Sequence, residues 1–404
     1  MIPFSPPRID DKTIEEVKET LLSGWITTGP KTKLFEKHIS SYCGHKRTIC
    51  VSSATAGFEL MMNWFGVGRG DEVIIPAYTY CAIANAVVHL GAKPVMVDVD
   101  DDFTISPEKI RESVTSKTKV IIPVDVGGYP ADYKRIYDII NEKKIKEKFC
   151  PDNDVQKGLG RILVISDAAH SLGASTEGKK VGILTDITIF SFQATKNITT
   201  CEGGAVCINL PKPFDCDKIY KQIAIKSLHG QTKDAYSKTK GNSWRYDILE
   251  AGYKSNMTDL QAAMGLVELK RYESDMLPKR KYIFNKYYNA LKDKKWAILP
   301  PADNSKNKSA CNVFMLRVSG VNEQQRDEII KRVYNDGASL NVHYIPLPLL
   351  SFYRELNYNI ENFPKSYELY SNEISLPIYY DLTDGNVDFI INSLVRNIES
   401  VLGV

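Results

Sequence analysis

The stretch DEVIIPAYTYCAIANAVVHLGAKPVMVDVD, residues 71–100, decides the fold class. Its runs at 71–77 and 93–100 are rich in valine and isoleucine, and the segment at 83–90 between them has apolar residues at helical spacing. Strands that are apolar on both faces and are joined by helices are typical of a parallel sheet covered on both sides. The stretch therefore predicts a strand–helix–strand unit of an α/β fold.

The same alternation continues on both sides of this stretch. Further strands are expected at 47–53, 119–126, 161–170, 186–192 and 204–210, with helices at 56–65, 107–114 and 132–143 and two more in front at 11–23 and 31–42. The pattern predicts one mainly parallel α/β sheet. In such open sheets the ligand lies at the carboxyl ends of the strands.

The length of 404 residues predicts a second domain, because single cores stop growing near about 250 to 300 residues. After a long helix at 257–272 the pattern changes to helix, loop, a strand at 311–320, a helix at 323–336 and a closing helix at 387–402. We expect a large α/β domain over residues 1–275 and a smaller α+β domain over 276–404. The charged stretch at 143–160 is interpreted as a surface insertion.

Composition narrows the class of protein. The chain has 43% hydrophobic and 25% charged residues and a net charge of +3, which is typical of a globular protein. It has no basic blocks, so we do not predict nucleic-acid binding. No run approaches the about 18 apolar residues of a membrane span, and the amino terminus is not typical of a secretory signal, so a cytoplasmic protein without membrane association is expected.

The eight cysteines contain no CxxC pair, and the six histidines are scattered along the chain. Reduced buried thiols are the better interpretation of such cysteines, and disulfides or zinc the poorer one. No metal site is predicted from the histidines.

Two polar residues follow predicted buried strands and suggest chemistry together. Asp167 ends the run VISD, and Lys196 ends the run FSFQATK. Taken alone, Asp167 could be a helix cap or a solvated carboxylate, and Lys196 could be a solvated loop charge. Taken together they suit pyridoxal 5′-phosphate (PLP), which needs an anion at its protonated ring nitrogen and a lysine that forms a Schiff base.

Two other strand ends are compatible with the same cofactor. The stretch VSSATAGFEL at 51–60 offers hydroxyls and small residues at a strand-to-helix turn, where a helix amino terminus attracts phosphate, although an ordinary cap fits equally well. Tyr78 and Tyr80 follow another strand, where one ring could stack on a planar ligand or pack in the core.

Six collinear motifs carry a resemblance to a known family. They are TTGPKTKLFE at 27–36, SSATAGFEL at 52–60, DEVIIPAYTYCAIANAV at 71–87, DAAHSLGA at 167–174, FSFQATKNITTCEGG at 190–204 and GYKSNMTDLQAAMG at 252–265, with LNVHYIPLPLL at 340–350 as a looser match. In this order the chain resembles the sugar aminotransferases of the DegT/DnrJ/EryC1/StrS family. The resemblance implies a fold-type I PLP-dependent transferase, with a large domain around a mostly parallel seven-stranded sheet and a smaller carboxyl-terminal α+β domain. It also implies a homodimer whose active sites are shared between subunits.

The resemblance assigns roles to individual residues. Lys196 matches the Schiff-base lysine and Asp167 the partner of the ring nitrogen, so both are predicted to be catalytic. Tyr80 matches the position that stacks on the cofactor ring, and His170 a position beside its phenolic oxygen. Asn256 matches an asparagine that reaches the phosphate of the neighbouring subunit's cofactor.

The phosphate-binding positions of the family fall on Ala54, Thr55, Ala56 and Ser191. Ala54 stands where glycine is common in the family. Gln193 stands where histidine is common, so an acid or base role at that position is in doubt because glutamine does not titrate.

The reaction that the resemblance implies is transfer of an amino group, with L-glutamate as donor, through PLP and its pyridoxamine form (PMP) to a keto group of a nucleotide-linked deoxysugar. The commonest substrate of the family is a 4-keto-6-deoxyhexose, and the product would be an amino sugar of a surface polysaccharide or a glycosylated product. A 3-keto sugar or a non-catalytic binding protein of the same fold are the alternatives, and a related dehydrating branch carries histidine where this chain has Lys196. Candidate substrate contacts, which could equally be surface residues, are His229, Arg245 and His343.

Overall fold

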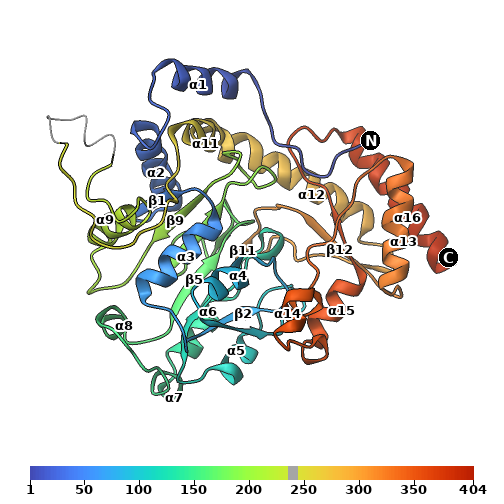
Figure 1. Cartoon of the computed structure of the whole chain (residues 1–404). Coiled ribbons are helices and arrows are strands. Elements are labelled where there is room, and N and C mark those ends of the chain that lie inside the picture. The colour runs from blue at the N-terminus through green and yellow to red at the C-terminus, as the bar shows by residue number, and fades with distance from the viewer. Residues whose placement is uncertain (235–243) are drawn as a thin grey trace.

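The computed structural model describes residues 1–234 and 244–404, and its large sheet has seven strands (Figure 1). They are β1 (Arg47–Val51), β2 (Glu72–Pro76), β3 (Lys93–Val97), β4 (Thr118–Ile121), β5 (Leu163–Asp167), β8 (Ile187–Ser191) and β9 (Gly204–Ile208). Their order is β1-β9-β8-β5-β4-β2-β3, and only β9 runs antiparallel to its neighbours. The predicted α/β class with a mostly parallel sheet is confirmed.

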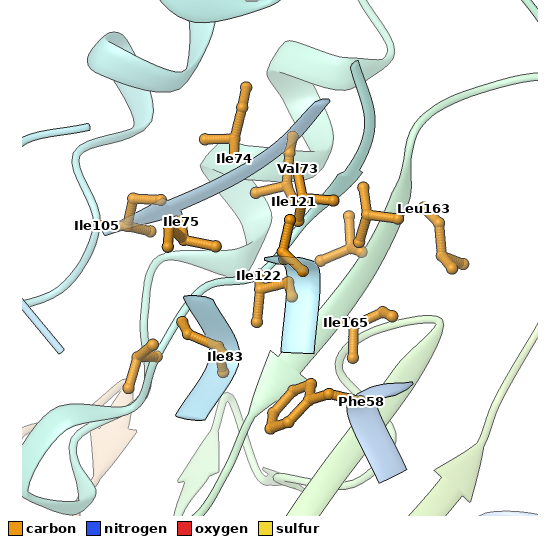
Figure 2. Packing of buried hydrophobic residues seen from close by; sticks show 14 of the residues in the cluster. Phe58, Val73, Ile74, Ile75, Ile83, Ile105, Ile121, Ile122, Leu163 and Ile165 are labelled. Atoms are coloured by element: carbon orange, nitrogen blue, oxygen red, sulfur yellow. The ribbon is translucent and has the colours of Figure 1, made fainter. Parts of the chain in front are cut away.

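Helices join and cover these strands. They include α3 (Ala54–Phe65), α4 (Ala82–His89), α5 (Pro107–Ser113), α6 (Tyr133–Ile140) and α9 (Cys216–Lys226). Figure 2 shows the resulting core, in which Phe58 of α3 and Ile83 of α4 pack against the isoleucines of β2, β4 and β5. Full burial of each such side chain contributes about 1.5 to 3 kcal/mol, so the parallel strands are held mainly by apolar contact on both faces.

Three further helices close one side of the large domain. Helix α2 (Pro30–Cys43) packs against α11 (Asp259–Arg271), while α1 (Asp11–Leu22) also contacts α11. A β-carbon at Gly265 would lie 2.4 Å from the ring of Phe35, so the two helices approach too closely there for any side chain. The buried carboxylate of Asp259 accepts from the amides of Gly29 and Thr32 at 2.8 and 2.9 Å and holds the start of α2 against α11.

The carboxyl-terminal part has its own sheet and core. Strands β10 (Ala297–Ile298), β12 (Phe314–Val318) and β13 (Glu373–Leu376) form an antiparallel sheet beside α12 (Leu277–Leu291), α13 (Glu323–Asp336) and α16 (Asp384–Leu402). A second apolar cluster, which includes Phe314, Ile329 and Ile390, fills the space between them. The division at residues 275 and 276 stays a prediction. The sequence pattern did not predict β13, α14 (Ser351–Glu355) or α15 (Pro364–Asn372).

The stretch at 143–160 forms two short helices, α7 (Lys143–Lys146) and α8 (Asp154–Leu159). Asn153 and Gln156 donate to the carbonyl of Phe65 at 3.1 and 2.9 Å, so this stretch caps the carboxyl end of α3. Asp152 pairs with the buried Lys119 at 2.5 Å. These contacts fix the stretch on the large domain.

The first residues of the chain cross to the carboxyl-terminal part, where the amino terminus lies in Figure 1. Ile2 donates to the carbonyl of Gly337 at 2.7 Å and accepts from Ser339 at 2.9 Å. All eight cysteines are free thiols. Among the described helices none has the length and apolar character needed to cross a membrane, and residues 1–234 and 244–404 contain no group of three metal-ligating side chains.

Candidate active site

Three strand ends meet at one edge of the large sheet. Val51 at the end of β1 pairs with Gly204, Gly204 pairs with Ser191 at the end of β8, and Asp167 at the end of β5 pairs with Ile189 of β8. The strands β1, β5 and β8 run in the same direction, so their carboxyl ends lie side by side. This is the edge at which the sequence predicts a ligand.

Lys196 follows β8 and reaches this edge. Its Nζ lies 2.9 Å from Nε2 of His170, and the two side chains line a small cavity together with Phe4, Thr195 and His343. Burial lowers the pKa of Lys196, and the negative charge of Asp167 acts in the opposite direction. Lowering the pKa of a lysine increases the share of its neutral amine, which is the form that attacks carbonyl groups and accepts protons.

Asp167 is a buried carboxylate with few partners. It is 8% exposed, and Oδ1 accepts from the amide of Ala169 at 3.1 Å. Burial raises the pKa of Asp167 to about 6, against the hydrogen bond from Ala169 and the charge of Lys196. Because a buried anion is costly unless a cation meets it, this carboxylate suits a protonated ring nitrogen.

The proton of neutral His170 is placed by the backbone. The amide of Gly127 donates to Nδ1 of His170 at 3.3 Å, so the ring carries its proton on Nε2. That nitrogen lies 2.9 Å from both Lys196 Nζ and the hydroxyl of Tyr344. Burial is the main cause that holds the pKa of His170 well below its usual value, and the charge of Lys196 is the second cause. His170 is therefore neutral and donates a hydrogen bond toward the cavity.

A second buried carboxylate fixes the loop that supplies Gly127. Asp125 accepts from the hydroxyls of Ser171 and Tyr133 at 2.6 and 2.5 Å and from the amide of Ala131 at 2.9 Å. Burial raises the pKa of Asp125 to about 7. Ser171 is the residue after His170, and Asp125 lies two residues before Gly127. The hydrogen bond between Ser171 and Asp125 therefore holds the segments that carry His170 and Gly127 next to each other.

The predicted phosphate positions are also brought together. Ser53 caps α3 by accepting from the amide of Ala56 at 3.1 Å, so Ala54, Thr55 and Ala56 form the first turn of that helix. A β-carbon at Gly204 would lie 2.6 Å from the amide nitrogen of Ala54, and Gly204 is the strand partner of Ser191. The helix amino terminus and Ser191 therefore lie at the same strand ends, where the helix dipole favours an anion.

Three other residues singled out from the sequence, Tyr78, Tyr80 and Asn256, do not line the cavity. Tyr80 is 61% exposed, and its ring centre lies 6.0 Å from that of Tyr344, so its face is open beside the site. Tyr78, by contrast, is fully buried and donates to the carbonyl of His343 at 2.5 Å. Asn256 donates to the hydroxyl of Thr28 at 2.6 Å in the same chain.

Of the three candidate substrate contacts, only His343 lines the cavity around Lys196. His229 is exposed, and its amide donates to the carbonyl of Tyr253 at 2.7 Å. Arg245 is exposed too, with its guanidinium 5.3 Å from the ring centre of Trp244. The roles given to all these residues stay predictions.

A model of the DegT/DnrJ/EryC1/StrS aminotransferase family matches residues 7–149 and 154–395. The chain belongs to this family. The four unmatched residues at 150–153 fall within the stretch that carries α7 and α8.

Relatives of this sugar aminotransferase cover the whole chain. Spr1654 of Streptococcus pneumoniae, described as a sugar aminotransferase, has been solved in a PMP form that is 42% identical, with a TM-score of 0.95 and 100% of both chains covered, and in a PLP form that is 41% identical. SpsC of Bacillus subtilis, a spore coat polysaccharide biosynthesis protein, is 34% identical over 98% of this chain and 97% of its own. PseC of Helicobacter pylori, an aminotransferase in pseudoaminic acid biosynthesis, is 25% identical with a TM-score of 0.86 over 98% of this chain and 99% of its own.

The predicted fold-type I architecture, enzyme class and cofactor are thereby confirmed: the protein is a PLP-dependent sugar aminotransferase that cycles through PMP. The side chains at the strand ends fit this cofactor. Lys196 offers a desolvated amine, Asp167 a buried anion in need of a cation, and the first turn of α3 beside Gly204 a place for phosphate. The alternative of a non-catalytic binding protein with the same fold therefore does not apply to this chain.

Several residues around the cavity were not predicted. Asn312 and Phe4 line it, and Tyr344 is hydrogen-bonded to His170. The buried Arg280 donates to the carbonyls of two lining residues, Ile378 and Lys196, at 2.9 and 3.5 Å. For Tyr344 a signal existed, because it stands next to His343 in LNVHYIPLPLL. For the others the sequence offers no local pattern.

Proposed function

We propose that this aminotransferase moves an amino group from L-glutamate to the keto group of a nucleotide-linked 4-keto-6-deoxyhexose. The observation that carries the proposal is that Lys196 and His170 line one polar cavity, with the buried carboxylate of Asp167 close enough for its charge to act on Lys196, in a chain of this family. SpsC and PseC support a role in surface polysaccharide synthesis, because their names place them in the synthesis of spore coat polysaccharide and pseudoaminic acid. A 3-keto sugar is the alternative substrate.

Lys196, Asp167 and His170 have different roles in the proposed transamination. PLP, when bound, supplies an electron sink that stabilises negative charge on the amino-bearing carbon. Lys196 Nζ would take the proton from the amino-bearing carbon and return it to a carbon of the cofactor. Its lowered pKa lets it act first as base and then as acid. Asp167 would keep the ring nitrogen of the cofactor protonated, and His170 presents an N–H from Nε2 to the cavity.

A test of the proposed substrate uses the two half-reactions separately. Incubation with L-glutamate is expected to convert the PLP form to the PMP form, which changes the visible absorbance. The PMP form is then offered dTDP-, UDP- and GDP-linked 4-keto and 3-keto sugars, and the products are analysed by mass spectrometry and NMR. Amination at carbon 4 is expected; amination at carbon 3 alone would select the alternative, and amination of none would overturn the proposal.

We also propose a homodimer that shares its active sites. Trp244, Tyr246, Ile248 and Leu249 are between 50% and 74% exposed, on the segment that stands out from the body at the left of Figure 1. Four large apolar side chains within six residues are costly in water, and a second copy of the chain would cover them. His229, Arg245 and Asn256 lie on or beside this segment and do not line the cavity of their own chain, which supports a role for them at the site of a second copy.

A double variant, Trp244→Glu with Leu249→Glu, is expected to convert the dimer to a monomer in sedimentation velocity. The two added charges would have to be buried without partners in the interface, which costs several kcal/mol. Cofactor absorbance and turnover should fall at least about tenfold, in line with a loss of about 1.4 kcal/mol or more. Leu356→Glu, at another exposed leucine, is the matched control, and a fully active monomer would contradict the shared site.

The cytoplasmic location stays a prediction.

A further inference from the structure

A chain of hydrogen bonds runs from the cavity into the carboxyl-terminal sheet. Nδ1 of His343 lies 2.9 Å from the hydroxyl of Ser375, and that hydroxyl donates to Oε1 of Glu373 at 2.6 Å. The backbone amide of His343 donates to Oε2 of the same carboxylate at 3.0 Å. Ser375 and Glu373 are fully buried on β13, so no solvent competes for these bonds.

The charge on Glu373 decides the direction of the bonds. An ionised carboxylate only accepts, so Ser375 must turn its proton toward Glu373 and accept from His343 through Nδ1–H. The proton of neutral His343 is then on Nδ1, and Nε2 keeps a lone pair. This is the opposite arrangement to His170, whose Nδ1 accepts from Gly127 and whose Nε2 donates.

Other contacts fix the His343 ring at the wall of the cavity. The ring of Phe4 stacks on it at 5.6 Å between centres and 27°, and Tyr78 donates to the carbonyl of His343 at 2.5 Å. The rings of His343 and His170 stand edge to face, 6.0 Å apart. Among the described residues, Nε2 of His343 has no hydrogen-bond partner, so this nitrogen is available to a ligand in the cavity.

We propose that Glu373 and Ser375 are positioning residues that set the tautomer of His343, so that, when Glu373 is ionised, Nε2 of His343 accepts a hydrogen bond from a hydroxyl group of the acceptor sugar. This rests on the proposed function. A neutral nitrogen lone pair attracts a hydroxyl donor and offers nothing to the carboxylates of an amino-acid donor. This chain of hydrogen bonds from His343 through Ser375 to Glu373, here called the relay, therefore acts in the sugar half-reaction. It leaves the amino-donor half-reaction unchanged.

The relay reverses when Glu373 takes up a proton. The backbone amide of His343 can only donate, so it keeps Oε2 as an acceptor and a carboxyl proton must lie on Oε1, facing Ser375. Ser375 then donates to Nδ1 of His343, and the ring proton moves to Nε2. Burial raises the pKa of Glu373 to about 8, opposed by the hydrogen bonds from Ser375 and His343 and by the charge of Arg326 on α13. The other titratable or charged residues close to it are Tyr78, Tyr344 and Arg317, the last of which is the ladder partner of Glu373 on β12.

The variant Glu373→Gln tests the relay, because its outcome is fixed by geometry. The amide oxygen of the glutamine must face the backbone amide of His343, so its NH₂ group faces Ser375 and donates. His343 is thereby locked with its proton on Nε2 at every pH. The wild-type ring should instead move its proton from Nε2 to Nδ1 as the pH rises through about 8.

The tautomer is read by long-range ¹H–¹⁵N correlation on holoenzyme labelled in its six histidines, with His343 assigned by the loss of its signal in His343→Gln. Above pH 8 we expect Nδ1–H in the wild type and Nε2–H in Glu373→Gln. Above the same pH, kcat/KM for the sugar half-reaction should be about three- to tenfold lower in Glu373→Gln than in the wild type, as for the loss of one hydrogen bond. The rate with L-glutamate should not change. Glu368→Gln, on the exposed face of α15, is the matched control.

Ser375→Ala interrupts the relay without adding a donor, and it should remove the pH dependence of the tautomer. Equal tautomers in wild type and Glu373→Gln would overturn the relay even if sugars are aminated. Different tautomers with unchanged sugar kinetics would overturn the contact with a hydroxyl group. The tautomer is measured without a sugar. Failure of every keto sugar in the panel would therefore count against the proposed substrate, while the tautomer measurement would still decide whether the relay exists.

Discussion

Lys196→Ala is expected to abolish transamination and to remove the visible absorbance of bound PLP. Alanine can neither attach the cofactor nor carry the proton, and loss of a general acid and base alone costs about 100- to 10,000-fold in rate. We therefore expect turnover at least about 1,000-fold below that of the wild type. The fold should persist, because the side chain of Lys196 is hydrogen-bonded only to His170 among the described residues, while its backbone bonds to Gln193 and Arg280 remain.

Controls separate this effect from general damage. Lys157→Ala removes an exposed lysine of α8 that pairs with Asp154, and it should leave absorbance and rate unchanged. Borohydride treatment of the wild-type holoenzyme, followed by peptide mass analysis, should place the reduced cofactor on Lys196 and on no other lysine. A Lys196→Ala protein that still turns over would disprove the assignment.

Much of the large sheet could be predicted because its signals are local. The apolar runs that end in Asp167 and Ser191, and the helices between them, lie within a few residues of one another in the sequence. The reversed direction of β9 could not be predicted in this way, because all five of its residues are buried and the pattern is the same in either direction.

The carboxyl-terminal strand β13 escaped prediction for a physical reason. Its four residues are all buried, yet two of them, Glu373 and Ser375, are polar, so the run EISL lacks the apolar pattern of a core strand. Local rules tend to fail where function places polar groups in the interior. The same holds for Asp125, which the sequence pattern places within a strand and which in the structure is the buried anchor of the loop beside His170.

Part of the site could not be predicted because its contacts span the chain. Tyr344 and His170 are 174 positions apart, and Ser5 and Thr195 are 190 apart. No periodicity or spacing in one sequence predicts such pairs. They arise where the carboxyl-terminal part and the first residues of the chain close over the strand ends of the large sheet.

Asp167→Asn is expected to slow transamination by about 100- to 1,000-fold while the cofactor remains attached. Asparagine keeps the shape of the side chain but has no charge to hold the ring nitrogen protonated, so the electron sink is weakened. Loss of one partner of a buried, charged hydrogen bond costs about 2 to 5 kcal/mol, and each 1.36 kcal/mol is tenfold in rate. Lys196 is intact in this variant, so visible absorbance should persist, and this combination distinguishes it from Lys196→Ala.

The pH dependence of cofactor uptake gives a second measurement on the same carboxylate. In the apoenzyme the pKa of Asp167 is raised to about 6, so the anion is present above this pH and is lost as the pH falls through it. Titration of apoenzyme with PLP should therefore show affinity that weakens below about pH 6, and Asp167→Asn should lose this inflection because it has no group to titrate. Asp154→Asn, at an exposed carboxylate of α8, should keep the wild-type profile. An unchanged inflection in Asp167→Asn would assign it to another group and would remove Asp167 from the ring nitrogen.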